Sequence, residues 1–225
     1  MTEPVPQRPP PPAQPQANMH PIRLVVADDL QRSRLTTFFR LILVYPHLWY
    51  LAIWGLAVFF VLIAQWFYTL FKGHPSPRMH GFLTRYVRQY TVVMAYYRLL
   101  ANPYPHFQGI VGDYPIDVEV DPPAEQARWK TLLRIILVIP AYVLAYIFQY
   151  LGVIVSIISW LVAIFVARVP KGLRDFGAFM LRWETQTWAY VFLLTDRYPS
   201  LSTPEPKGPV EVVPPPRPTL TGNYV

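Results

Sequence analysis

The stretch LILVYPHLWYLAIWGLAVFFVLIAQWFYTLF, residues 41–71, decides the fold, because its 31 residues carry no formal charge between Arg40 and Lys72. A second run, IILVIPAYVLAYIFQYLGVIVSIISWLVAIFVA (residues 135–167), lies between Arg134 and Arg168. The hydrocarbon core of a bilayer is about 30 Å thick, and about 20 apolar residues cross it as a helix. Both runs exceed that length, so the sequence predicts an integral membrane protein.

The composition agrees with this prediction. Hydrophobic residues make up 53% of the 225 residues and charged residues only 15%, against about 25% charged in soluble domains. The net charge of +7 is typical of Lys and Arg flanking membrane segments, so no nucleic-acid partner is expected. The absence of cysteine excludes disulfides and thiol catalysis. Residues 1–19 contain no apolar signal segment, and the first run is expected to act as the insertion signal.

Both ends of the chain are rich in proline. Residues 1–19 hold seven prolines and residues 199–225 hold eight. Segments with so little apolar surface cannot offset the entropy of ordering, so 1–19 and 203–225 are predicted to be disordered tails. Residues 1–19 contain the PxxP patterns Pro9-x-x-Pro12 and Pro12-x-x-Pro15, but four consecutive prolines generate such patterns trivially, so a spacer is favoured over a docking peptide.

An internal duplication organises the rest of the chain. A shift of 94 residues, without a gap, makes 24 of the 85 positions from 21 to 105 identical to their counterparts, where chance gives about one in fifteen. Shared apolar bias does not explain the matched arginine, proline and tryptophan positions. The chain therefore divides into repeat 1 (20–107), a linker (108–113) and repeat 2 (114–202).

Each repeat is predicted to contain a short strand, a long apolar helix and an amphipathic helix. The predicted fold is thus an all-α integral membrane protein with short β-strand segments. Pro46 and Pro140 are expected to kink or break the helices of residues 41–71 and 135–167. Residues 78–101 place aromatic side chains on one face and arginines on another, which is typical of a helix in the membrane interface. Packing of this helix against the apolar helix of its own repeat is the alternative, and the two are compatible. Residues 172–195 are the second copy of this helix.

The number of membrane crossings stays open at the sequence level. Three basic residues precede each apolar run within about 17 residues and four follow it, so the positive-inside rule assigns no orientation. One crossing per repeat, with the repeats inverted, is the favoured arrangement. Hairpins that return to the same side, and four spans, are the alternatives. Arginines in the middle of the amphipathic helices disfavour four spans.

Charges shared by the two repeats are the candidate functional residues. They are the pairs Arg34/Arg128, Arg40/Arg134 and Arg88/Arg182, and they are expected to contact anionic lipid headgroups or an acidic partner. No catalytic, metal-binding or cofactor-binding constellation is found, since the five histidines form no ligand pair and no nucleophile or phosphate-binding motif is present. Neither apolar run contains a carboxylate, which argues against an ion-coupled transporter.

The repeat also resembles a known family. The residues that carry the resemblance are Arg34 to Arg40, Leu43-Val44-Tyr45-Pro46-His47, Trp66, Tyr96 to Leu100 and Tyr104-Pro105-His106-Phe107. They resemble the bacterial membrane family called domain of unknown function 4389, present here in two tandem copies over residues 20–200. The second copy departs from the pattern, with Ala141 in place of His47. The resemblance implies a bacterial inner-membrane location, and it adds no expectation about an activity.

These observations predict a non-enzymatic membrane scaffold or an accessory subunit of a membrane complex. The alternatives are a small homo-oligomeric channel or transporter, and a module that binds anionic lipids. A lipid-modifying enzyme is the least favoured alternative. The expected partners are the lipid bilayer and a protein bound through the tails.

Overall fold

The computed structural model describes residues 20–201, and the two proline-rich tails fall outside this range. Each repeat contributes a strand, one long apolar helical segment and one shorter helix. In repeat 2 the long apolar segment is split into two helices. The elements are β1 (Ile22–Val26), α1 (Arg34–Lys72), α2 (Pro77–Tyr97), β2 (Ile116–Val120), α3 (Arg128–Leu137), α4 (Ile139–Val166) and α5 (Lys171–Val191). The predicted order of strand, apolar helix and amphipathic helix is therefore confirmed in both repeats.

The two strands pair with each other rather than within one repeat. β1 and β2 form an antiparallel sheet in which Leu24 pairs with Val118, and these residues are 94 positions apart in the chain. The hydroxyls of Thr91 and Thr185, also equivalent in the two repeats, lie 3.0 Å apart. Two self-equivalent contacts show that a local pseudo-two-fold axis relates the repeats. The repeats consequently form one unit that shares a sheet and a core.

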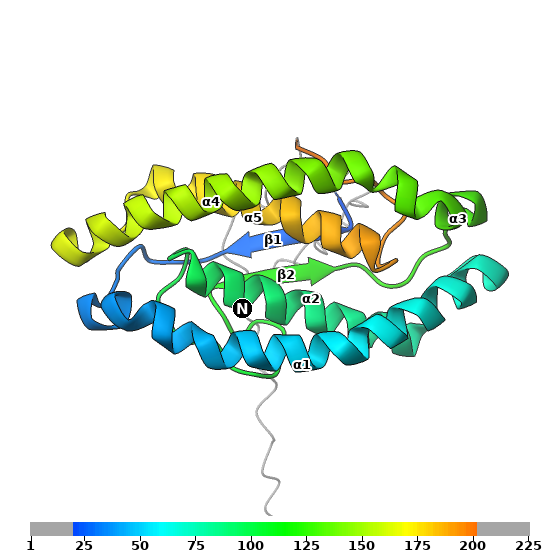
Figure 1. The fold of residues 1–225 in the computed structure, drawn as a ribbon, viewed down its shortest axis with the longest axis horizontal. Coiled ribbons are helices and arrows are strands. Elements are labelled where there is room, and N and C mark those ends of the chain that lie inside the picture. The colour runs from blue at the N-terminus through cyan, green and yellow to red at the C-terminus, as the bar shows by residue number, and fades with distance from the viewer. Residues whose placement is uncertain (1–19, 202–225) are drawn as a thin grey trace, which may run out of the picture.

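The helices are arranged symmetrically about this axis (Figure 1). α1 and α4 run in opposite directions along the two long edges of the molecule, and α2 and α5 lie between them. At each end of the molecule a tryptophan of one repeat donates a hydrogen bond to the long apolar segment of the other repeat. Trp66 Nε1 donates to the Thr131 carbonyl at 2.9 Å, and its equivalent Trp160 donates to the Thr37 carbonyl at 3.0 Å.

The two prolines have different effects. α1 continues through Pro46 as one helix of 39 residues, so the expected break does not occur in repeat 1. In repeat 2 the helix is interrupted at Val138, two residues before Pro140. The neighbouring sequence differs as well: the buried ring of His47 stacks on Phe107 at 4.0 Å, whereas repeat 2 has Ala141 at that position.

Most of α2 and α5 is buried or half-buried, so both helices pack against the rest of the protein, which is compatible with a position at the membrane interface. The predicted aromatic stripe of α2 contacts other helices: Tyr86 packs on Trp54 of α1 and Tyr90 packs on Trp188 of α5. On α5, Met180 and Leu181 are fully buried. The amphipathic pattern was recognised correctly, and side chains of its apolar face contact other helices while Tyr86, Tyr90 and Trp188 remain half-buried.

α1 and α4, by contrast, expose apolar side chains along their whole length. Both are long and apolar enough to cross a membrane. Large apolar side chains that are more than half exposed on α1 are Leu35, Phe38, Leu41, Ile42, Tyr45, Trp49, Ile53, Leu56, Phe59, Phe60 and Phe71, and those on α4 are Ile139, Val143, Tyr146, Tyr150, Ile154, Ile157, Phe165 and Val166. Exposed apolar patches of this size mark a surface that contacts a membrane or another protein.

The loop from α2 to β2 gives a first testable prediction. Gly109 has a φ of +58°, and a Cβ there would lie 2.7 Å from the Arg85 carbonyl oxygen, which is backbone and cannot move aside. We therefore expect Gly109→Ala to lower the free energy of unfolding by about 2 kcal/mol or more, because strain and a clash add.

The matched control for this substitution is Gly112→Ala. Gly112 also has a positive φ, of +72°, but nothing lies within 4 Å of a Cβ there. Gly112→Ala should lower the free energy of unfolding by only about 1 kcal/mol, the cost of a positive φ without a clash. Thermal unfolding of both variants measures the difference, and equal losses would contradict the close approach at Gly109.

Candidate functional site

Two of the predicted arginines hold the ends of the inner helices. Arg40, on α1, is fully buried and donates to the carbonyls of Tyr96, Ala101 and Asn102 at 2.9, 3.1 and 3.2 Å. Its guanidinium also lies 4.2 Å from the centre of the Tyr96 ring. The carbonyls at the end of a helix lack partners and carry partial negative charge. Arg40 satisfies them and fixes α2 to α1.

Arg134 does the same in repeat 2. It donates to the carbonyls of Tyr190 and Thr195 at 2.6 and 3.0 Å, and it lies 4.3 Å from the centre of the Tyr190 ring. It also forms an ion pair with Asp196 at 3.3 Å. Arg40 has no such ion pair, because the residue equivalent to Asp196 in repeat 1 is Asn102. The donors of this pair therefore point into the protein and not toward a headgroup.

The second pair lies beside the sheet. Arg88 donates to Asp117 and to the Val118 carbonyl, both at 2.9 Å. Arg182 donates to the Leu201 carbonyl at 3.2 Å and lies 5.3 Å from the centre of the Phe179 ring. These arginines connect the inner helices to β2 and to the end of the described chain.

The third pair remains accessible. Arg34 and Arg128 are exposed at the first residues of α1 and α3. Arg34 donates to the Phe165 carbonyl near the end of α4 at 3.1 Å. Arg128 lies beside Gly73, at the end of α1, where a Cβ would be 3.5 Å from its Nε. Of the six predicted contacts, these two are placed where a lipid headgroup or a partner can reach them.

Sequence reasoning missed a buried ion pair between the repeats. Arg98, just after α2, donates through both terminal nitrogens to Glu184 of α5 at 2.8 and 2.9 Å, and the two side chains are 2% and 3% exposed. Burial raises the pKa of the Glu184 carboxyl, and the Arg98 guanidinium acts in the opposite direction. The repeat alignment hides this pair, since Phe192 and Tyr90 occupy the equivalent positions.

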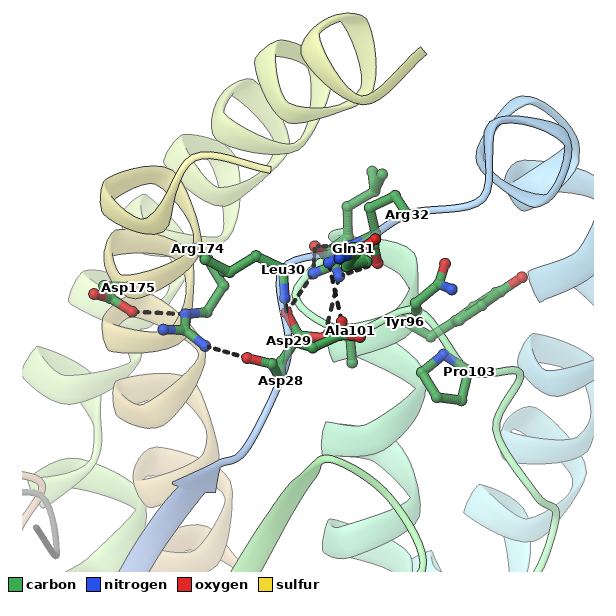
Figure 2. Close-up of polar contacts among 12 residues, drawn as sticks. Asp28, Asp29, Leu30, Gln31, Arg32, Tyr96, Ala101, Pro103, Arg174 and Asp175 are labelled. Atoms are coloured by element: carbon green, nitrogen blue, oxygen red, sulfur yellow. Dashed lines mark hydrogen bonds and ion pairs between the residues drawn. The ribbon is translucent and has the colours of Figure 1, made fainter. Parts of the chain in front are cut away.

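A second missed cluster holds one end of the molecule (Figure 2). Arg32 forms an ion pair with Asp28 at 2.8 Å, and both side chains are almost fully buried. Arg32 also donates to the Leu99 carbonyl at 2.8 Å. Figure 2 shows Arg174, from α5, reaching the Asp28 carbonyl. In repeat 2 the equivalent of Arg32 is Gln126, which donates to the Leu193 carbonyl at 2.8 Å, so the same contact is made without the charge.

Two apolar grooves lie at positions related by the pseudo-two-fold. The larger has a volume of about 530 Å³ and is lined by residues of α1, α3, α4 and α5, among them Leu62, Trp66, Arg134 and Trp188. The smaller, of about 250 Å³, is lined by the equivalent Ser156, Trp160 and Arg40. The replacement of Leu62 by Ser156 is one of the differences between them. Each groove is open on one side and has a clamped arginine in its wall.

A buried histidine predicts a dependence of stability on pH. His20 Nδ1 accepts the Ile22 N–H at 3.1 Å, and Nε2 lies 3.3 Å from the Tyr198 carbonyl, which suits a neutral imidazole. Burial lowers the pKa of His20 from its usual 6.5. Below about pH 6.5 the unfolded chain therefore binds a proton that the folded chain does not, and stability falls as pH falls.

Thermal unfolding at pH 7.5 and pH 5.5 tests this expectation. The wild-type protein should melt at a lower temperature at pH 5.5. His20→Gln should reduce the difference between the two pH values, and the exposed control His74→Gln should leave it unchanged. A His20→Gln variant with the full wild-type pH dependence would contradict the assignment.

The chain is a duplicated protein whose two repeats share one core. Each repeat contributes one long apolar helix that is a candidate membrane helix. The family described as Domain of unknown function (DUF4389) matches residues 34–108 and 128–202, one copy in each repeat. The chain belongs to this family, which confirms the resemblance seen in the sequence. No curated protein and no solved structure matches the chain.

Proposed function

We propose that the protein is embedded in a lipid bilayer through α1 and α4 and acts there as a non-enzymatic scaffold or accessory subunit. The observation that supports embedding is the exposed apolar surface of these helices, which contains no charged residue between Arg40 and Lys72 or between Arg134 and Arg168. A bacterial cell membrane remains the predicted location.

The use of the polar groups supports a structural role. The terminal nitrogens of Arg40, Arg98 and Arg134 donate to groups of the protein itself. The buried polar chemistry thus assembles the two repeats, which suits a protein that presents a surface.

The scaffold proposal is tested on native membranes. Membranes are washed at alkaline pH, extracted in mild detergent and analysed by blue native electrophoresis. We expect the full chain to stay with the membranes and to migrate in a complex with a stoichiometric partner. A variant with Pro9 to Pro12 replaced by alanine tests whether the tail holds that partner. Migration as the chain alone, in wild type and variant alike, would contradict the scaffold role.

The grooves favour a second candidate, a module that binds lipid acyl chains. An opening of about 530 Å³ lined by Leu62, Trp66 and Trp188 offers apolar contacts along a chain, and the exposed Arg128 near the same end of the molecule can pair with an anionic headgroup. Native mass spectrometry should detect bound lipid. Val191→Trp, which fills the larger groove, should remove it, whereas Tyr97→Trp at the equivalent position in the smaller groove should not.

A further inference from the structure

We propose that the protein lies flat in one leaflet of the bilayer, with α1 and α4 parallel to the membrane plane and the sheet facing water. This inference rests on the proposed embedding in a membrane and states how the embedding occurs. In this orientation α1 and α4 do not cross the bilayer as expected from the sequence. Their exposed side chains contact the acyl chains of a single leaflet.

The position of the sheet is the first argument. Figure 1 shows β1 and β2 midway along the length of α1 and α4. On the sheet, Arg23 forms ion pairs with Glu119 and Asp121 at 2.9 and 2.8 Å, and the two carboxylates are 40% and 45% exposed. If α1 and α4 crossed the bilayer, these partly exposed charges would lie near its midplane, where charged groups are costly. A flat orientation leaves them in water.

The ends of the described chain give the second argument. His20 contacts the Tyr198 carbonyl, and Gln186 donates to the Ile22 carbonyl, so both ends lie beside the sheet. Residues 1–19 and 202–225 are attached there, and they contain charged residues such as Glu3, Arg8 and Lys207. Helices that crossed the bilayer would place both attachment points at mid-depth.

The face opposite the sheet is apolar. On α2, Arg88 contacts the strand β2, and Tyr86 and Tyr90 lie two residues to either side of it, on the opposite face of the helix. On α5, Trp188 packs on Tyr90 and lines both the larger groove and the small pocket beside Tyr86. These side chains are half-buried, and most of the exposed apolar side chains come from α1 and α4 on either side of them. The flat orientation places all of them against the leaflet.

The dimensions and the charged ends fit the same orientation. α1 has 39 residues and is about 58 Å long, nearly twice the hydrocarbon thickness of about 30 Å, but an in-plane helix has no such limit. Exposed basic residues stand at both ends of the apolar surface: Arg34, Lys72, Arg128, Arg168 and Lys171. In the plane of the leaflet they can reach the phosphates of the headgroups.

Labelling of single cysteines tests the proposal, because the chain has none of its own. The equivalent residues Gln31 and Glu125 are both exposed and lie at opposite ends of the molecule, and Glu119 lies on the sheet. Each is replaced by cysteine in the full chain, and cells are treated with a membrane-impermeant maleimide before and after permeabilisation. Ile53→Cys, 71% exposed on α1, is the control for a lipid-facing position.

The flat orientation predicts that Gln31→Cys, Glu125→Cys and Glu119→Cys all react from the same side, while Ile53→Cys reacts from neither. Reaction of Gln31→Cys and Glu125→Cys from opposite sides, with Glu119→Cys silent, would overturn the flat orientation and leave the membrane embedding intact. Reaction of Ile53→Cys, together with release of the protein by an alkaline wash, would reject the embedding itself.

Discussion

Arg98→Ala is expected to lower the melting temperature in detergent by about 10 °C. Removing one partner of a buried ion pair costs about 3–5 kcal/mol, because the other charge is left buried without a partner, and each kcal/mol corresponds to about 2–4 °C for a protein of this size. Both terminal nitrogens of Arg98 bind Glu184. The guanidinium also packs against Gly152 of α4, where a Cβ would lie 3.1 Å away.

A double substitution separates the charge from the packing. In the variant Arg98→Met with Glu184→Met, no charge is left unpaired, so most of the lost stability should return. Circular dichroism during heating measures the wild type, the double variant and the single variants Arg98→Met and Glu184→Met. If the double variant were as unstable as the sum of the two single variants, the ion pair would contribute nothing beyond its two side chains.

Arg40→Ala and Arg134→Ala are the second pair of substitutions with a large expected effect. Each removes a charged donor from at least two buried carbonyls at the end of an inner helix, and hydrogen bonds to charged groups contribute about 1.5–3 kcal/mol each. Each also loses contact with a tyrosine ring. We expect each variant to lose about 3–5 kcal/mol and to melt over a broader range, because α2 or α5 is no longer fixed at its end.

Two controls define the cause. Arg40→Lys keeps the charge but cannot reach three carbonyls with the planar fork of arginine, so it should recover less than half of the loss. Arg34→Ala removes an exposed arginine with one carbonyl contact and should change the melting temperature by about 2 °C or less. If Arg34→Ala were as damaging as Arg40→Ala, the clamping role of the buried arginines would be wrong.

The duplication made much of the fold predictable. A shift of 94 residues located both strands, both apolar segments and both amphipathic helices without any alignment of relatives. The pairing of Leu24 with Val118 could not be predicted, because register depends on how the two copies meet in space. The burial of α2 and α5 stayed open at the sequence level for a related reason. An amphipathic pattern shows that one face is apolar, but it does not say whether lipid or protein covers that face.

The repeat alignment singled out the candidate arginines, but it could not show which groups they contact. Arg40 and Arg134 stand out in the repeat alignment because both copies need a cation at a helix end. Their partners are backbone carbonyls, which every residue has, so the sequence does not identify them. Arg98 and Glu184 were missed because the pair joins the repeats and has no equivalent in the other half. Contacts that break the internal symmetry are invisible to a comparison of the two copies.

The depth of α1 in the membrane tests the account most directly. Tyr45, Leu56 and Phe67 are exposed, and a spacing of 11 residues places them on nearly the same face, each about 16.5 Å further along the helix. Spin labels on single cysteines at these positions report immersion depth in liposomes through collisions with oxygen and with a water-soluble nickel complex. The flat orientation predicts three similar depths within one leaflet. A deep label at Leu56 between two shallow labels would show that α1 crosses the bilayer and would contradict the account.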